Sequence, residues 1–440
     1  MVGPAPTQDP AVPMGEPSEA EAWALLLTVT GLGPAGFGAL LREHGGGRAI
    51  LAAAARPGAA AAFAATAEAA DGRTAFGLNV GRAIVELARA TDAPLRLLRD
   101  SDVVIVTLDD PEYPPRLRAI DLPPPVLFVR GEITGLAAGI AVAVVGTRRA
   151  TERGRLTAAR IAAAIARAGA VIVSGLAVGI DGAAHTAVVA EGRPTIAVLG
   201  SGHRFLYPRA HARLADGIIA TGGAMVSEMW PGDEPAPGTF PRRNRLISGL
   251  SSATIVVEAG DRSGALITAD WALKQGRDCF FVPGPLFEPR SAGCLHWLRQ
   301  YSGAARIVAG IPELIEDLGL LDGAAGTPVV GGQPSLDATL IELGPTAREV
   351  ARALLATQGT LDDLVAATGH ETATVLGAIT LLELRGLATT TYGRYRAAGR
   401  LASADPRETV DREARAASVR PGRDSARARQ KGLPHRSEPC

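Results

Sequence analysis

The sequence lacks the features that mark disulfide-rich, metal-binding, secreted and membrane proteins. Its cysteines, Cys279, Cys294 and Cys440, form neither a CxxC pair nor a metal-ligand spacing. It has no apolar run of about 18 residues, which a membrane-spanning helix needs. Residues 1–20 are rich in Pro, Ala and Gly and have neither the basic nor the apolar region of a secretory signal. We therefore expect a disordered lead over residues 1–20 and a cytoplasmic protein with reduced thiols, no metal and no membrane partner.

The chain also has no formal net charge and very little lysine. The 45 basic and 45 acidic side chains give a formal net charge of zero, which argues against a uniformly basic nucleic-acid binder. Only Lys274 and Lys431 are lysines, so arginine carries nearly all the positive charge. Residues 141–251 contain 13 arginines against seven acids. Because arginine suits bidentate phosphate contacts, this segment is the first place to look for a phosphate site.

Residues 21–100 are predicted to form a small helical module. The glycines of LTVTGLGPAGFGALLREHG make a formal GxGxxG, but the segment before them is helix-like, and Pro34 suits the first turn of a helix. We expect two short helices joined by the Gly-Leu-Gly turn, which resembles a helix-hairpin-helix or SAM-like module. Two roles stay open: the turn amides contact a nucleic-acid backbone, or the module only packs.

The pattern of residues 101–320 indicates an α/β domain. Short apolar runs such as IAVAVVG, VIVSG, PTIAVLG and ATIVVEAG alternate with segments of helix length. The runs are continuously apolar, which is typical of strands buried on both faces of a parallel sheet. Repeated strand–helix units predict an open, Rossmann-like parallel sheet with right-handed crossovers, in which ligands bind at the carboxyl ends of the strands.

Three segments are predicted after the large domain. A Pro- and Gly-rich connector is expected at 321–344, and three helices with a hairpin around Gly393 predict a winged helix over 345–398. The third of these helices carries only Arg385 as a base, which favours a protein-contact or structural role over major-groove reading. The arginine-bearing segment 399–440 is expected to be a basic, disordered tail.

The strand–helix junctions of the large domain carry groups that can hold a phosphate. Amides at the start of a helix favour an anion, and a guanidinium beside them adds a fixed positive charge. The second strand ends without the acid that a dinucleotide ribose requires, so no nicotinamide cofactor, and no cofactor of any kind, is expected. The predicted junction residues are Gly146, Thr147, Arg148, Ser174, Gly175, Arg209, Ser263 and Gly264.

The stretch FPRRNRLISGLS carries the densest basic cluster. Arg242, Arg243 and Arg245 lie at the start of a predicted helix, where positive charge opposes the macrodipole unless an anion compensates. Phe240 places an aromatic ring beside them, a pairing typical of single-strand grooves. Together with the junction donors, this cluster predicts a site for a repeating polyanion. The alternative is that these arginines are solvated or form internal ion pairs, with three candidate partners: Asp233, Glu234 and Glu258.

A hydrolytic triad can also be drawn, from Ser174, Asp181 and His185. The GxSxG pattern that a nucleophile elbow needs is absent. We therefore interpret Asp181 as a residue that caps or braces a helix and His185 as a structural group with satisfied hydrogen bonds, and we predict no catalytic residue.

Taken in order, these motifs resemble those of the DprA family, also called Smf, of bacterial DNA-processing proteins. The match spans about residues 100–310 and includes VAVVGTRRAT, VSGLAVGIDGAAH, FPRRNRLISGLS and VVEAGDRSGALITADWALKQGR. The family's G-[ST]-R arginine corresponds to Arg148. Its FPxRNR cluster is placed on Arg242, Asn244 and Arg245, with Arg243 in the variable slot. The sequence departs from the family pattern by an extra residue before Gly303 and at four positions: Trp230, His203, Arg204 and Leu295.

The resemblance implies a non-catalytic protein that binds single-stranded DNA without sequence preference. It also implies a homodimer that loads the RecA recombinase onto incoming DNA and displaces single-strand-binding protein. Two other functions stay open. One is a nucleotide hydrolase like the phosphoribohydrolases, although their PGGxGTxxE signature is missing here. The other is an interaction scaffold that uses the winged helix and the tail.

Overall fold

The computed structural model describes residues 15–69, 76–133, 139–320, 336–356, 360–391 and 394–402. The predicted lead lies outside them over residues 1–14, and the predicted tail lies outside them from residue 403 onward. Residues 19 and 20 already belong to the first helix, so the predicted lead is too long at its end.

Six helices form the N-terminal module in the described residues. They are α1 (Glu19–Leu26), α2 (Pro34–His44), α3 (Gly47–Ala53), α4 (Ala59–Ala69), α5 (Leu78–Arg89) and α6 (Asp92–Arg99). A capping box of Ser18 and Glu21 starts α1, and Pro34 occupies the first turn of α2. Gly31, between these helices, has φ of +88°, which glycine adopts without strain. The predicted helix pair around a Gly-Leu-Gly turn is confirmed.

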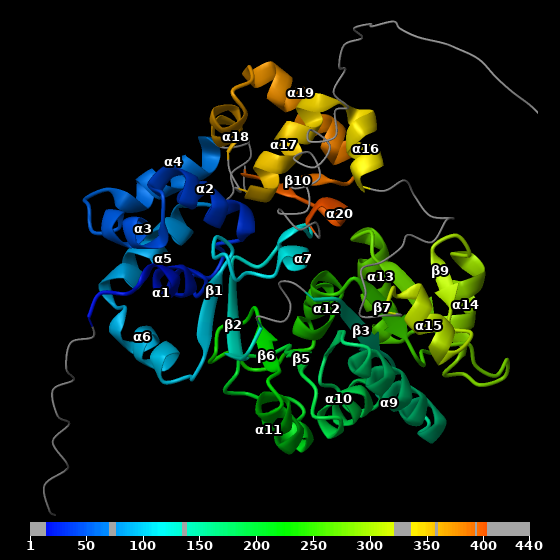
Figure 1. Ribbon diagram of the computed structural model, residues 1–440. Coiled ribbons are helices and arrows are strands. Elements are labelled where there is room, and N and C mark those ends of the chain that lie inside the picture. The colour runs from blue at the N-terminus through cyan, green and yellow to red at the C-terminus, as the bar shows by residue number, and fades with distance from the viewer. Residues whose placement is uncertain are drawn as a thin grey trace, which may run out of the picture. The chain divides into compact units, whose positions relative to one another are not determined.

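A nine-stranded sheet forms the centre of the large domain (Figure 1). Its strands are β1 (Val104–Thr107), β2 (Val126–Gly131), β3 (Ala141–Val145), β4 (Val171–Ser174), β5 (Thr195–Val198), β6 (Ala224–Ser227), β7 (Ala253–Val256), β8 (Asp278–Phe281) and β9 (Ala305–Ile307). Strands β3 to β9 pair in parallel, as predicted. At one edge β2 runs antiparallel to both β1 and β6. The predicted parallel sheet is confirmed for β3 to β9, and an antiparallel edge adds to it, because the short β1–β2 connection reverses the chain without a full crossover helix.

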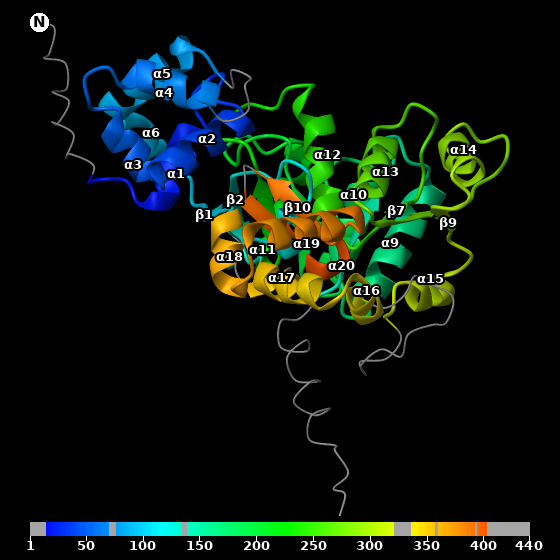
Figure 2. The ribbon, with the colours of Figure 1, turned by 90° about the horizontal axis from the view of Figure 1, so that it is seen from above.

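Helices cover both faces of this sheet (Figures 1 and 2). One face carries α9 (Glu152–Arg167), α10 (Ile180–Ala190), α11 (Ala212–Ala220) and α15 (Ile311–Asp317), and the other carries α12 (Thr239–Leu250), α13 (Gly264–Lys274) and α14 (Ala292–Gln300). The short helices α7 (Pro115–Arg118) and η1 (Arg209–His211) lie in connections. In β3, Val142 and Val144 pack toward α9 and α10, whereas Ala143 and Val145 pack toward α12 and α13. Burial on both faces explains why the strands are continuously apolar.

The strand order reverses at β3. The sheet runs β1-β2-β6-β5-β4-β3-β7-β8-β9, so β4 to β6 extend to one side of β3 and β7 to β9 to the other. In doubly wound sheets, the crevice outside the carboxyl ends of the strands at such a switch point is the usual ligand position. The ends of β3 and β7 are therefore where a site is expected.

The C-terminal elements form the predicted winged helix. They are α17 (Pro345–Ala356), α18 (Leu361–Thr368), α19 (Thr372–Leu384), β10 (Ala388–Thr391) and β11 (Arg394–Ala397), with the two strands paired antiparallel. Two further helices are α16 (Leu336–Leu343), inside the predicted connector, and α20 (Gly399–Ala402), inside the predicted tail. The prediction of irregular chain is wrong at both places, because Leu340 and Leu401 are buried in the winged-helix core.

Candidate nucleic-acid interface

A cleft of about 690 Å³ lies at the carboxyl ends of β3, β4 and β7. The β3–α9 loop and the first turn of α13 give it a polar wall, and Tyr207, Phe240 and a group of prolines give it an apolar wall. The reversal of strand order thus brings together junctions as far apart in sequence as Gly146 and Gly264. Eight of the predicted binding residues line the cleft: Gly146, Thr147, Arg148, Phe240, Arg243, Asn244, Ser263 and Gly264.

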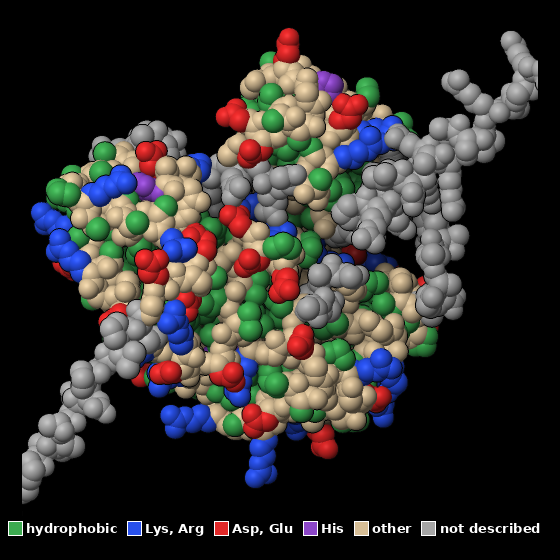
Figure 3. All heavy atoms as spheres, turned by 60° about the vertical axis from the view of Figure 1, so that its left-hand side comes forward, with side chains coloured by type: hydrophobic (Ala, Val, Ile, Leu, Met, Phe, Trp, Pro, Cys, Tyr) green, Lys and Arg blue, Asp and Glu red, His purple; other side chains and the backbone are tan. Residues whose placement is uncertain are grey.

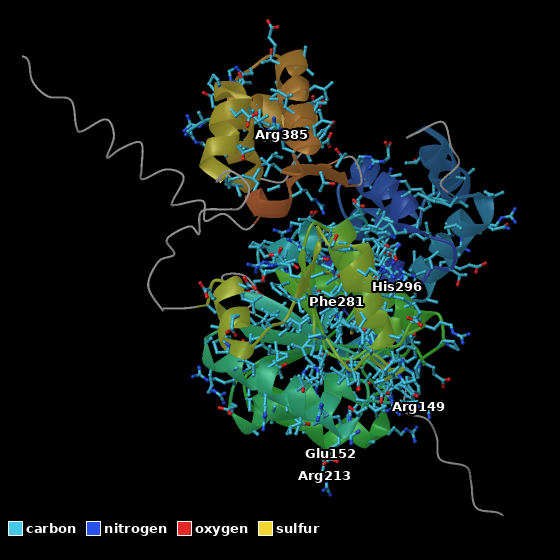
Figure 4. All side chains as sticks on the ribbon, turned by 90° about the vertical axis from the view of Figure 1, so that its right-hand side faces the viewer. Arg149, Glu152, Arg213, Phe281, His296 and Arg385 are labelled. Carbon is cyan, nitrogen blue, oxygen red and sulfur yellow. The ribbon has the colours of Figure 1, made fainter. Side chains whose placement is uncertain are left out.

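The β3–α9 loop is held in place by hydrogen bonds to a buried glutamate. The Thr147 amide donates to the Glu258 carbonyl at 2.7 Å, and the Thr151 amide donates to Glu258 Oε2 at 2.8 Å. Thr151 also caps α9. This anchoring leaves Arg148 and Arg149 exposed, and Figure 4 shows Arg149 projecting from the ribbon into solvent. The loop therefore presents two guanidinium groups on a fixed backbone.

An aromatic pair lies beside this loop. The Arg148 Cζ atom lies 5.1 Å from the centre of the Phe240 ring, and the Tyr207 ring lies 5.5 Å from that of Phe240. Tyr207 is 48% exposed, a large fraction for an aromatic side chain. A flat ring system can stack here next to a cation. The sequence prediction omitted Tyr207 and Arg149, although the first precedes the predicted Arg209 by two residues and the second follows the predicted Arg148.

Arg243 is buried, and it fastens α12 to the ends of two strands. Its Nη1 donates to the Gly175 carbonyl at 2.8 Å and to the Val198 carbonyl. A Cβ at Gly175 would lie 2.6 Å from Arg243 Nη2, so this approach requires glycine. Burial lowers the pKa of Arg243 to about 10, against the opposing effect of the Asp181 carboxylate. Asp181 is itself buried, which raises its pKa. The two charges therefore stabilise each other in the floor of the cleft.

The other two arginines of the cluster contact Glu228 instead. The Arg245 side chain is 10% exposed, forms an ion pair with Glu228 and donates to the Leu122 carbonyl at 3.1 Å. The Arg242 side chain is 67% exposed, and its Nε lies 3.5 Å from Glu228 Oε1. The internal-pairing alternative therefore applies to both Arg242 and Arg245, with a partner outside the three acids proposed from the sequence.

Helix geometry explains why these arginines separate. Because α12 begins at Thr239, Arg242, Arg243 and Arg245 all lie within it, and successive residues of a helix point about 100° apart. Counting along FPxRNR puts Arg242 in the variable slot and Arg243 at the first arginine, which corrects the sequence-based placement. The exposure of Arg242 and the burial of Arg243 agree with this correction.

The remaining predicted residues do not line the cleft. The Ser174 hydroxyl is fully buried and donates to the Val144 carbonyl at 2.6 Å. The Gly175 carbonyl accepts a hydrogen bond from Arg243. Arg209 is exposed in η1 and does not line the cleft. The DNA-binding role of all thirteen residues stays a prediction.

The groups of the hypothetical triad have other partners. His185 is fully buried, and its Nδ1 lies 2.9 Å from the Thr195 hydroxyl oxygen. Ser174 is committed to a strand carbonyl, and the Gly175 amide donates to Asp181 at 3.2 Å. Burial lowers the pKa of His185 to about 3. These contacts fit structural roles for Asp181 and His185. The prediction that the hydrogen bonds of His185 are satisfied is wrong at Nε2, which is buried without a partner.

Acid is expected to destabilise the protein through His185. In the unfolded chain this residue gains a proton below about pH 6.5, whereas in the folded chain it stays neutral down to about pH 3. The free energy of unfolding is therefore highest above pH 6.5 and decreases as the pH is lowered from there to pH 3. Between pH 7.5 and pH 5 this term amounts to about 2 kcal/mol. In urea unfolding at both pH values, His185→Gln should lose less stability than the wild type. His296→Gln, at an exposed position (Figure 4), should not differ from the wild type.

The described part of the chain contains neither a cluster of metal-ligating side chains nor an accessible thiol. No group of three His, Cys, Asp or Glu side chains there could hold a metal ion. Cys279 and Cys294 are buried, and burial raises the pKa of each thiol to about 12. Among the helices of the described ranges, none combines the length and the hydropathy needed to cross a membrane.

Comparisons with known proteins cover both the large domain and the winged helix. The profile of the family described as DNA recombination-mediator protein A matches residues 104–319, and that of the DprA winged helix domain matches residues 334–394. DNA processing protein DprA of Bacillus subtilis is 40% identical over 225 residues, 51% of this chain and 74% of that protein. Protein Smf of Escherichia coli is 42% identical over 230 residues, 52% of this chain and 60% of that protein. The X-ray structure of DprA from Streptococcus pneumoniae superposes with a TM-score of 0.55 at 30% identity, covering 69% of this chain and 98% of that chain.

Proposed function

The chain belongs to the DprA/Smf family of DNA-processing proteins, and from this premise we propose that its cleft binds single-stranded DNA without reading the base sequence. One observation carries the proposal: a cationic loop and an aromatic wall meet at the switch point of the sheet, with Arg148 5.1 Å from the ring of Phe240. A phosphate group binds to the cationic loop, and an unpaired base stacks on the aromatic wall.

The polar wall supplies phosphate donors from three elements. Arg148 and Arg149 extend from the β3–α9 loop, and the exposed Gly264 begins α13, whose N-terminus favours an anion. No side chain or backbone atom would contact a Cβ added at Gly264, so the space above it is open to a ligand. Asn244 lies between these elements and donates to the Gly264 carbonyl at 3.1 Å. Successive phosphates of one strand can follow this wall.

The apolar wall explains why base sequence is not read. Tyr207 and Phe240 offer ring faces, which stack on any base. The rest of the wall is mainly proline, which has no side-chain donor or acceptor for a base edge: Pro235, Pro237 and Pro241. A paired duplex cannot offer its base faces in this way, so a single strand is the preferred ligand.

The zero net charge of the chain gives DNA no general attraction to it. On the face shown in Figure 3, basic and acidic side chains are interspersed. This distribution agrees with the zero net charge. Non-specific attraction by the whole surface is therefore weak, and binding depends on the local donors of the cleft.

We propose binding without bond cleavage. In phosphoribohydrolases the acid of PGGxGTxxE takes part in the chemistry, and here the corresponding segment reads VVEAGDRSGALITA. Of its two acids, Glu258 is buried, with Oε2 accepting a hydrogen bond from the Thr151 amide, and Asp261 is exposed outside the lining of the cleft. The Glu258 carboxylate supports the β3–α9 loop and does not face a ligand.

Family membership extends the proposal to partners. We propose that the chain acts as a homodimer, that it passes its bound strand to the RecA recombinase, and that it displaces single-strand-binding protein in doing so. Light scattering of the free protein tests the first part. RecA filament formation on strands coated with single-strand-binding protein, with and without this chain, tests the other two.

The full-length protein is expected to bind oligo-dT more tightly than a duplex of equal length, and about as tightly as a mixed-sequence strand. Because phosphate contacts release counterions, each neutralised phosphate should contribute about −0.7 to the slope of log K against log salt. Anisotropy titrations from about 50 to 300 mM salt measure this slope. Equal affinity for duplex and single strand, or a slope near zero, would refute the proposal.

A further inference from the structure

Two neighbouring arginines lie at the opposite, amino-terminal edge of the sheet. Arg116 belongs to α7, and Arg277 directly precedes β8. Arg277 Nη2 donates to the Arg116 carbonyl at 3.0 Å, and Arg116 Nη1 donates to the Gly139 carbonyl at 2.8 Å, two residues before β3 begins. These contacts place the pair beneath the starts of β3 and β8, whereas the cleft lies beyond the ends of β3 and β7.

This pair has no counter-charge in the described residues. No ion pair found there includes either guanidinium, and both side chains are partly buried. Burial lowers the pKa of Arg116, and it lowers the pKa of Arg277 to about 10, with the charge of Arg116 adding to the effect. Two like charges therefore lie in a poorly solvated position, where each destabilises the other.

Other buried or partly buried arginines of the domain have a counter-charge nearby. The charge of Arg243 is opposed by Asp181, and Arg245 forms an ion pair with Glu228. Arg118, two residues from Arg116, has the carboxylates of two nearby aspartates acting on it. An uncompensated pair is therefore not a general property of buried arginines in this fold.

Unused hydrogen-bond donors point to the missing partner. Each guanidinium has five N–H donors, of which one is used on a backbone carbonyl. The Nε atoms of Arg116 and Arg277 are both buried without a hydrogen-bond partner, so a ligand from solution does not reach them. Three Nη N–H groups are left on each side chain, and a tetrahedral oxyanion accepts several such bonds at once and supplies the missing charge.

We propose that Arg116 and Arg277 together bind a phosphate group at the amino-terminal edge of the sheet, as a second anion site separate from the cleft. The phosphate is either free in solution or belongs to a DNA strand that continues past the cleft. Both sources share the same chemistry, a tetrahedral oxyanion held by two arginine forks.

Thermal unfolding of the full-length protein tests the site, in a variant whose cleft is disabled by Arg148→Ala and Arg149→Ala. At matched ionic strength, saturating phosphate should raise its Tm over chloride by about 3 °C or more. Adding Arg116→Lys or Arg277→Lys, which keeps the charge but removes the planar fork, should abolish this rise. No rise, or a rise that persists in both lysine variants, would overturn the proposal.

A second measurement does not depend on the lysine variants folding. The phosphate ³¹P resonance should broaden on addition of the cleft-disabled protein, and excess pyrophosphate should reverse the broadening. Absence of broadening would also overturn the proposal. The two sources are then separated with DNA. If a strand supplies the phosphate, Arg277→Lys weakens binding of a long oligo-dT but not of a six-nucleotide one. If the phosphate is free, neither affinity changes.

Discussion

Replacing Arg148 and Arg149 together by alanine is expected to weaken oligo-dT binding about 150-fold or more while the protein stays folded. Each guanidinium would lose a charge-assisted hydrogen bond to a phosphate, worth about 1.5 kcal/mol or more. Both side chains are exposed, so the free energy of unfolding should change by less than about 0.5 kcal/mol per residue. Anisotropy titrations across salt concentrations should also give a slope less negative by about 1.4.

The control for this variant removes the same charge elsewhere. Arg160 lies on α9 and Arg193 lies in the loop before β5, and both are exposed. Arg160→Ala with Arg193→Ala should leave oligo-dT affinity within about twofold. The Debye length at physiological salt is about 8 Å, so the attraction between DNA and exposed charges farther away than this is largely screened. An equal loss in both variants would mean that net charge alone attracts DNA. Unchanged binding by the Arg148/Arg149 variant would place the site outside the cleft.

The architecture could be predicted from sequence because the pattern that encodes it is local. Each strand of the parallel part is a short, continuously apolar run before a segment of helix length, and this pattern is visible without knowing any partner strand. The antiparallel edge could not be found in this way. Whether β2 pairs with β6, about 100 residues later, depends on contacts distant in the chain. The α16 helix was missed because its residues follow a Pro- and Gly-rich stretch and acquire their burial only from the winged-helix core.

The location of the candidate site could be predicted, but the direction of each side chain could not. Parallel strands have their carboxyl ends at one edge, so the junctions that carry Arg148 and Ser263 were expected at the same edge once the sheet was recognised. Which arginine of α12 reaches the cleft depends on the residue at which the helix begins. It also depends on Glu228, which lies 17 residues before Arg245 and removes that side chain from the ligand side. No charge count along the sequence distinguishes a guanidinium in an ion pair from one that is exposed.

Substituting Arg243 by methionine is expected to lower the free energy of unfolding by about 3–5 kcal/mol, whereas Arg242→Met should change it by less than about 0.5 kcal/mol. The two residues are adjacent in sequence but differ in burial. Methionine at 243 removes the donor from two strand-end carbonyls, those of Gly175 and Val198. It also leaves the buried Asp181 without the cation that favours its ionised form. Urea unfolding of both variants at pH 7.5 measures the difference, and equal midpoints would contradict it.

A second substitution separates the charge effect from the loss of hydrogen bonds. Removing one member of a buried charge pair is costly mainly because the other charge stays behind. Asp181→Asn in the Arg243→Met background should therefore restore part of the lost stability, although Asp181→Asn alone destabilises the wild type. If the two losses simply add, the charges do not interact, and Arg243 stabilises the fold only through its contacts with the carbonyls. If stability is partly restored, Arg243 and Asp181 form an interacting charge pair in the floor of the cleft. The predicted DNA contacts of Arg148 and Arg149 then depend on a structural support that neutral side chains at these two positions do not provide.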